Sequence, residues 1–200
     1  MITIIDYGLG NINAFYNIYK SLNIKTKIAR NASDLKKSTH IILPGVGAFD
    51  EAMSSLEKYD LRSAIVEKAN SKSAKILGIC IGMHILGANS EEGNQKGLNL
   101  IPGVVKKITN NNLLVPHMGW NTMNKISDNQ LLKSITVKDY FYFLHSYIFV
   151  PKDNSFTICE TDYSSNFTSA IKKDNIYGIQ FHPEKSHKCG IKLLKNFSEL

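Results

Sequence analysis

The chain has 200 residues and a formal net charge of +7, and 43% of its residues are hydrophobic. This size and composition fit one globular domain spanning residues 1–200, and the apolar runs are too short to cross a bilayer. The basic residues cluster in pairs at most, as at Lys36-Lys37, so we expect a solvated lysine-rich surface rather than a nucleic-acid site. A basic patch facing an acidic partner protein is the alternative.

The N-terminus and the cysteines point to a cytoplasmic protein. The first residues are apolar, meet an acid at Asp6 and lack a basic segment, which is typical of a first strand and not of a signal peptide. Cys80, Cys159 and Cys189 are widely spaced without a CxxC pair. This pattern predicts neither a disulfide framework nor a zinc site.

In the first half of the chain, strand patterns alternate with helix patterns. In chain order we expect a strand at 2–5, a helix at about 11–22, a strand at 24–29, a short helix capped by Ser33 or Asp34, a strand at 40–43, helical segments around 48–56 and 61–65, a strand at 75–79 and a helix at 81–88. Strands and helices that alternate through short connections predict an α/β fold with a mostly parallel central sheet flanked by helices.

The second half has a different pattern. Strand-like runs at 140–144, 147–150, 156–159, 168–171 and 176–181 are separated by polar turns, and a final helix carries Ile191, Leu193, Leu194 and Phe197. We expect antiparallel strands in this half. No linker or internal repeat divides the sequence, so a single domain is predicted.

The segment Gly78-Ile79-Cys80-Ile81-Gly82 lies where a buried strand gives way to a helix. Glycines on either side of the cysteine allow a tight, strained turn of the nucleophile-elbow type, and the start of a helix favours the thiolate. A buried cysteine in an ordinary strand–helix turn fits this pentapeptide equally well. The choice therefore depends on the partners of Cys80.

Such partners occur near the C-terminus, in His182-Pro183-Glu184. A strand would deliver His182 to the same edge of the sheet, and Glu184 would fall on the same side. A cysteine nucleophile needs a base, and that base needs a third group that fixes its tautomer. We therefore predict that Cys80, His182 and Glu184 form a catalytic triad.

Two glycine-rich turns remain. Pro44-Gly45-Val46-Gly47 follows a strand, and inward N–H groups at Val46 or Gly47, with that of Ile81, would stabilise an oxyanion; an ordinary strand–helix turn is the alternative. Gly8-Leu9-Gly10 imitates a dinucleotide fingerprint, but Asn13 occupies the third glycine position. We therefore exclude nucleotide binding.

In this order, the three motifs around Gly45, Cys80 and His182 resemble the class I glutamine amidotransferases over essentially the whole chain. The resemblance implies a flavodoxin-like fold. Further segments narrow it to the HisH family, the glutaminase subunits of imidazole glycerol phosphate synthase, and Pro116-His117-Met118-Gly119-Trp120-Asn121 is the most diagnostic. The other matching segments are residues 6–11, 44–49, 97–103, 145–147 and 180–186.

The resemblance implies that Cys80 attacks the glutamine side-chain amide, His182 moves protons and Glu184 orients His182. Ammonia would pass to a HisF-type synthase subunit in a heterodimer, for histidine biosynthesis. No metal or organic cofactor, nucleic acid or membrane is implied. The implied glutamine pocket comprises Gly45, Gly82, His84, Glu92, His145, Ser146 and Tyr147.

The resemblance also places Asn11, Met118, Trp120, Tyr142 and Lys185 at the interface with the partner. For three of these residues, a purely structural role is a strong alternative. Trp120 and Tyr142 could be core aromatics, and Lys185 a solvated lysine.

One position departs from the family. Where the family usually has Gln, four residues after the nucleophile, this chain has His84. Residues four apart share a helix face, so we expect His84 to lie close to Cys80, to keep contact with the pocket and to alter glutamine affinity. An imidazole there could also carry charge near neutral pH.

Three alternatives stay open. A HisH-like paralogue could supply ammonia to another acceptor, such as a sugar-amidating enzyme, and the sequence does not separate this from histidine biosynthesis. A cysteine hydrolase of similar fold is disfavoured by the Pro116–Asn121 segment. A non-catalytic docking subunit is disfavoured by the intact set of Cys80, His182 and Glu184.

Overall fold

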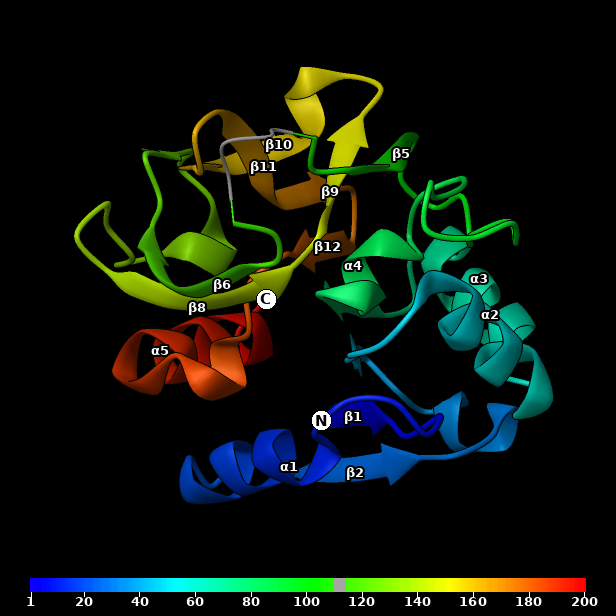
Figure 1. The fold of residues 1–200 in the computed structure, drawn as a ribbon. Helices are drawn as coiled ribbons and strands as arrows, with labels where there is room; N and C mark the ends of the chain where they lie inside the picture. The colour runs from blue at the N-terminus through cyan, green and yellow to red at the C-terminus, as the bar shows by residue number, and fades with distance from the viewer. Residues whose placement is uncertain (110–113) are drawn as a thin grey trace.

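The computed structural model describes residues 1–109 and 114–200 and is built around an eight-stranded sheet (Figure 1). The strand order is β2-β1-β3-β4-β12-β11-β10-β7. The first five strands run parallel, and β11, β10 and β7 continue the sheet in antiparallel fashion. In sheet order, the strands are Thr26–Ala29, Ile2–Ile5, His40–Leu43, Lys75–Ile79, Ile176–Ile179, Asn166–Lys173, Thr157–Asp162 and Lys125–Ile126. The predicted α/β fold is confirmed.

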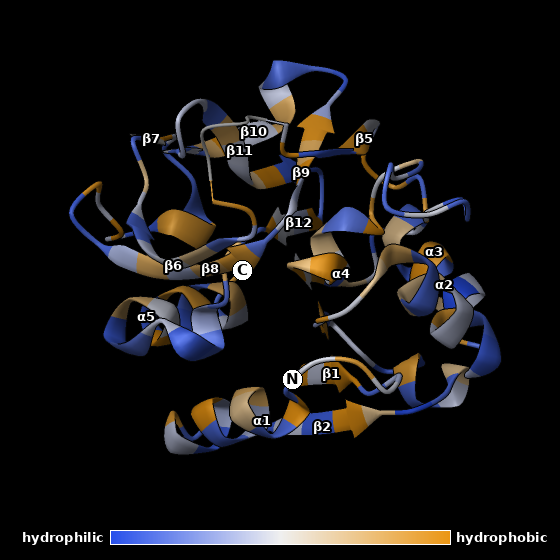
Figure 2. Ribbon diagram, viewed as in Figure 1, coloured by the Kyte–Doolittle hydropathy of each residue, from blue (hydrophilic) through white to orange (hydrophobic). Residues whose placement is uncertain are grey.

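Helices cover both faces of the sheet because successive side chains of a strand point to opposite faces. Ile41 and Leu43 of β3 pack with α2 and α3 in one core, whereas Ile42 packs with α1 and α5 in the other. The outer helices carry both apolar and polar residues (Figure 2). The α-helices are α1 (Ile12–Ser21), α2 (Phe49–Lys58), α3 (Arg62–Asn70), α4 (Ile81–His84) and α5 (His187–Ser198).

Two further pairs of antiparallel strands extend the fold. β5 (Gly103–Lys107) pairs with β9 (Tyr147–Pro151), and β6 (His117–Thr122) pairs with β8 (Tyr140–His145). Short 3₁₀ helices complete the described elements: η1 (Ala32–Leu35), η2 (Gln130–Leu132), η3 (Asn154–Phe156) and η4 (Pro183–Lys185). No helix among residues 1–109 and 114–200 is both long and apolar enough to cross a membrane.

The segments expected around 48–56 and 61–65 extend to Lys58 and Asn70, and two other helix boundaries differ from the prediction for a local reason. The helix after Cys80 ends at His84 rather than at residue 88. Beyond His84 the chain forms i→i+3 turns, and the N–H of Ala88 donates to the carbonyl of Gly103 in β5 instead of continuing the helix. The short helix before β3 is capped by Asn31, whose side chain accepts from the N–H of Asp34, and not by Ser33 or Asp34. An Asn side chain satisfies a free helix N–H in this way.

Helix α5 crosses the η4 turn, which carries Glu184, at Gly190. A Cβ atom on Gly190 would lie 1.8 Å from the carbonyl oxygen of Pro183. Only a residue without a side chain permits this approach, so the position of α5 helps to fix the η4 turn.

We expect Gly190→Ala to lower the free energy of unfolding by about 1–3 kcal/mol, because overpacking outweighs the gain of up to about 1 kcal/mol in helix propensity. Urea unfolding measures this change. Lys188→Ala, on the exposed side of the same helix, is the control and should stay within about 0.5 kcal/mol of the wild type. Equal stability of Gly190→Ala and Lys188→Ala would contradict the packing account.

Candidate functional site

The turn between β4 and α4 holds Cys80 in a strained conformation. Its backbone has φ 54° and ψ −112°, in a region that residues with side chains rarely adopt. A Cβ atom on Gly82 would lie 1.9 Å from the carbonyl oxygen of Leu43, and one on Gly78 would lie 2.3 Å from that of Gly82. The tight turn expected from the two glycines is therefore present, and both are required by close backbone contact.

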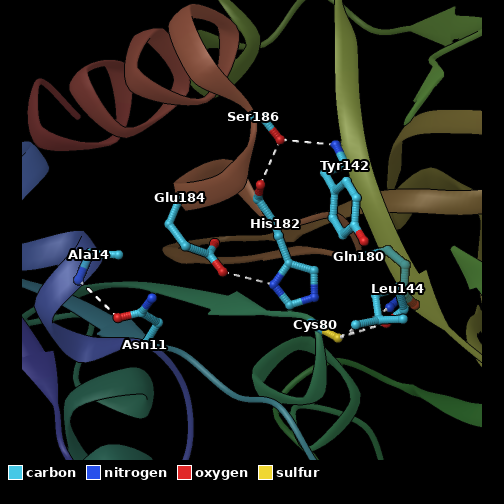
Figure 3. A network of polar contacts seen from close by, with 9 residues as sticks. All are labelled: Asn11, Ala14, Cys80, Tyr142, Leu144, Gln180, His182, Glu184 and Ser186. Carbon is cyan, nitrogen blue, oxygen red and sulfur yellow. Dashed lines mark hydrogen bonds and ion pairs between the residues drawn. The ribbon is translucent and has the colours of Figure 1, made fainter. Parts of the chain in front are cut away.

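His182 lies between Cys80 and Glu184 (Figure 3). Its Nδ1 is 2.9 Å from the Glu184 carboxylate, and both side chains are almost fully buried. A carboxylate only accepts hydrogen bonds, so Nδ1 carries a proton and Nε2 is the nitrogen left for the thiol. Nε2 has no hydrogen-bond partner in the part of the chain that the structure describes.

The backbone around His182 is held firmly by β8. The N–H of His182 donates to the carbonyl of Tyr142 at 2.8 Å. The hydroxyl of Ser186 donates to the carbonyl of His182 at 2.6 Å and accepts from the N–H of Tyr142 at 3.0 Å. This bracing fixes the imidazole without using either ring nitrogen.

The electrostatic surroundings of His182 favour its charged form. Burial alone would lower its pKa, but Cys80 and the Glu184 carboxylate outweigh burial and raise the pKa of His182 to about 10. His182 is therefore protonated at neutral pH, poised to give its proton to a leaving group.

Cys80 and His182 open into a cavity of about 220 Å³. Most of the predicted pocket and oxyanion residues line it. The lining residues are Val46, Gly47, Cys80, Ile81, His84, Glu92, Pro116, Leu144, His145, Ser146, Tyr147 and His182. Pro116 and Leu144 were not predicted as pocket residues.

Two residues predicted for the pocket do not line this cavity. Gly45 is buried, and a Cβ there would lie 2.9 Å from the Tyr7 hydroxyl and 3.1 Å from Cβ of Ile81. Gly82 meets the carbonyl of Leu43, as described above. Both glycines act in backbone packing beneath the cavity.

The Pro44–Gly47 turn forms one wall. Tyr7, for which no role was predicted, is fully buried and donates its hydroxyl hydrogen to the carbonyl of Pro44 at 2.6 Å. The N–H groups of Val46, Gly47 and Ile81 have no hydrogen-bond partner among the described residues. Free N–H groups at a cavity wall are suited to an oxyanion.

Glu92 closes another side of the cavity. Its carboxylate accepts from the N–H of Phe49 at 3.0 Å. Burial raises the pKa of Glu92, although the bond from Phe49 opposes this shift. Glu92 thereby ties the turn after β3 to the segment that follows α4.

A chain of histidine hydrogen bonds supports the wall formed by 145–147. Nδ1 of His145 donates to the carbonyl of Tyr147 at 2.9 Å, so its Nε2 must accept from Nδ1 of His117 at 3.0 Å. Burial lowers the pKa of His145 to about 3 and that of His117 to about 4. These neutral rings connect the Pro116–Asn121 segment to the pocket.

His84 lies in the cavity wall, as expected, but it is not charged near neutral pH. Its Nε2 is 2.7 Å from the side-chain oxygen of Gln180, and the ring is 2% exposed. Burial, partly offset by this hydrogen bond, lowers the pKa of His84 to about 4. Burial therefore opposes the charge near neutral pH that the sequence left open for this imidazole.

Of the five residues predicted to face a partner, four are exposed and Tyr142 is half-buried. Met118 is 64% and Trp120 46% exposed, so Trp120 is not a core aromatic. The Trp120 ring meets that of Tyr142 edge-on at 5.9 Å, and the ammonium of Lys185 lies 5.4 Å from the centre of the Tyr142 ring. Asn11 is also exposed; it caps α1, which packs against η4.

The chain is similar to known proteins over almost its whole length. The family model for class-I glutamine amidotransferases matches residues 3–199. The imidazole glycerol phosphate synthase subunit HisH of Leptospira interrogans is 46% identical, and subunit HisH 2 of Pseudomonas aeruginosa 42% identical; each alignment covers both chains fully. The solved structure of PurLQS from Thermotoga maritima superimposes with a TM-score of 0.77 at 16% identity, covering 99% of this chain and 97% of that one.

The neutral state of His84 predicts a specific pH dependence of stability. The folded-state pKa of about 4 lies below the ordinary value of 6.5, so the unfolded chain binds more protons between these pH values. The stabilisation is therefore complete above pH 6.5 and is lost as the pH falls toward 4.

Over that range we expect the free energy of unfolding to fall more steeply in the wild type than in His84→Gln, by up to about 1.4 kcal/mol per pH unit. Urea unfolding at a series of pH values measures both slopes. Above pH 7 the two proteins should differ by a constant amount. A constant difference from pH 7 down to pH 4 would show that His84 takes up its proton equally in the folded and unfolded chains.

Proposed function

The chain belongs to the class-I glutamine amidotransferases and, within them, to the HisH subunits of imidazole glycerol phosphate synthase, and from that premise we propose that it hydrolyses glutamine through Cys80, His182 and Glu184. The observation that carries the role of these residues is the position of His182. Its Nδ1 is bound to Glu184 at 2.9 Å, while its Nε2 is unpartnered among the described residues, on the side of Cys80.

In the first half of the reaction, the thiolate of Cys80 attacks the δ-carbon of glutamine. The oxygen of the tetrahedral intermediate takes up negative charge, which N–H groups of Val46, Gly47 and Ile81 would stabilise. The protonated Nε2 of His182 gives its proton to the leaving nitrogen. The C–N bond breaks, ammonia departs, and a thioester remains on Cys80.

In the second half, water hydrolyses this thioester. Neutral His182 takes a proton from the attacking water, the C–S bond breaks, and glutamate leaves. Glu184 keeps the imidazole in the required tautomer throughout and stabilises its charged form. The thiolate of Cys80 and the imidazolium of His182 are restored together.

The ammonia acceptor is a HisF-type synthase subunit, with which the chain forms a heterodimer for histidine biosynthesis. Met118, Trp120 and Lys185 are exposed and Tyr142 is half-buried. Met118 is paired with Leu144, which lines the cavity, and this position supports the assignment of the surface to the interface. Trp120 and Tyr142 are the kind of large aromatic that anchors protein interfaces.

A second candidate differs only in the ammonia acceptor. A relative that is 42% identical over its full length bears the name imidazole glycerol phosphate synthase subunit HisH 2. A paralogue that supplies ammonia to another acceptor, such as a sugar-amidating enzyme, would keep the same glutamine site. Transfer of amide nitrogen to each acceptor separates the two possibilities.

We further propose that the protein works in the cytoplasm. Cys80, Cys159 and Cys189 are all free thiols. Thiols persist unpaired in the reducing environment of the cytoplasm.

Cys80→Ala should lower glutamate release at least about a thousandfold, and Glu184→Gln by about a hundredfold or more, because the nucleophile and the orientation of its base are lost. The assay measures glutamate, and the transfer of ¹⁵N from labelled glutamine, with and without the HisF-type subunit. The wild type should be weakly active alone and much faster in the complex.

Cys159→Ser is the matched control, since this second buried thiol lies on β10 in contact with Ser169 rather than in the cavity. It should keep its activity. Glutamate release by Cys80→Ala at the wild-type rate would eliminate the proposed nucleophile, and equal rates with and without partner would eliminate partner control.

A further inference from the structure

Gln180 is a buried polar residue to which the proposed reaction gives no role. It follows β12 directly and precedes His182 by two residues, and it is 0% exposed. Its backbone N–H donates to the carbonyl of Ser169 at 2.9 Å. Its side chain reaches the nucleophile (Figure 3).

Hydrogen bonding fixes which way the Gln180 amide faces. Its oxygen lies 2.7 Å from Nε2 of His84, and its nitrogen lies 3.8 Å from Sγ of Cys80. In this orientation the amide oxygen accepts from Nε2–H of His84, the tautomer that puts no proton on the buried, unpartnered Nδ1. The amide N–H then points at the sulfur.

We propose that Gln180 is a positioning residue for the nucleophile: held by His84, it donates its amide N–H to the sulfur of Cys80 and stabilises the thiolate. This inference rests on the proposed function, which makes Cys80 the nucleophile. A reversed amide would place its oxygen against the thiolate, where two electron-rich atoms repel each other. The reversal would also require the proton of His84 on Nδ1, which is buried and has no partner among the described residues, so it would leave a buried donor unsatisfied.

A second contact of the sulfur distinguishes the two protonation states. The carbonyl of Leu144 lies 3.8 Å from Sγ of Cys80 and accepts from the S–H of the thiol. A thiolate has no proton to give Leu144 and gains from a donor instead. The amide of Gln180 is therefore the contact that favours the reactive form.

The other titratable groups near Cys80 do not replace the hydrogen bond from Gln180. The hydroxyl of Tyr7 is committed to Pro44, and His84 and His145 are held neutral by burial. His182 supplies the positive charge, with Glu184 behind it, while Glu92 and Tyr147 line the cavity. The amide of Gln180 adds a neutral dipole on a different side chain from the charge of His182.

The role of His84 follows from the same geometry. The histidine that departs from the family pattern acts on Cys80 through Gln180. Its Nδ1 is buried and has no partner within the described residues. A glutamine at position 84 could also donate an N–H to Gln180, whereas an aliphatic residue could not.

The pH dependence of Cys80 alkylation by iodoacetamide tests this inference, with each modified cysteine located by peptide mass spectrometry. Gln180→Met keeps the side-chain length and removes the donor, and should move the midpoint of the Cys80 profile upward by about one pH unit. Gln180→Glu keeps the acceptor for His84 but turns a carboxylate oxygen to the sulfur, so it should move the midpoint further. Cys189 is the internal reference, and its profile should stay unchanged in every variant.

His84 variants supply the matched pair. His84→Leu should move the midpoint upward by less than Gln180→Met, and His84→Gln should return it close to the wild-type value. A wild-type midpoint in Gln180→Met would overturn the inference; if Gln180→Met does not fold, a wild-type midpoint in Gln180→Glu does the same.

Glutamate release by the wild-type complex keeps this test separate from that of the proposed function. An active wild type with an unmoved midpoint in the Gln180 variants removes the role of Gln180 alone. A wild type that releases no glutamate with its HisF-type partner or another acceptor removes the proposed function, whatever the alkylation profiles are.

Discussion

The close contact between the end of β3 and the start of α4 sets the geometry of the whole site. The carbonyl of Leu43 occupies the space that a side chain on Gly82 would need, so the helix starts directly against the neighbouring strand. Cys80 absorbs the sharp change of direction through its positive φ of 54°. The strain is maintained because two flanking glycines and the buried sheet leave the chain no relaxed path. As a result of this strained turn, the sulfur of Cys80 is held at the carboxyl edge of the sheet and faces His182.

Around this turn, the fold places four buried histidines in two electrostatic states. His84, His117 and His145 are neutral because burial lowers their pKa, and the hydrogen bonds of His84 and His145 offset only part of that shift. His182 is charged because Cys80 and Glu184 reverse that balance. The neutral rings serve as donors of fixed direction that hold the pocket walls, whereas the charged ring serves proton transfer. Histidine thus both holds the pocket walls and transfers protons, and the neighbours of each ring determine which of these it does.

Much of this could be predicted from the sequence where a pattern is local. Strand–helix alternation identified β1, β2, β3 and β4 as parallel strands, and the glycines around Cys80 identified the strained turn. β12 lies in the half where antiparallel strands were expected, yet it pairs parallel with β4. The strands β5, β6 and β7 were missed, because polar residues interrupt their apolar alternation and their pairing is with distant segments. Tyr7 and Gln180 were missed for a related reason: each acts through a contact across the fold, at Pro44 and at Cys80, that no local spacing reveals. The neutrality of His84 depends on burial, which its position on a helix does not determine.

The most direct test of the account is a search for the covalent intermediate on Cys80. The complex with its HisF-type partner is mixed with glutamine, quenched in acid within the first turnovers, and digested for peptide mass spectrometry. We predict a glutamyl thioester, an added mass of glutamate less water, on the peptide that contains Cys80, and none on the peptides of Cys159 or Cys189. Glutamate release that continues in the Cys80→Ala complex, or an adduct on another cysteine in its place, would contradict the account.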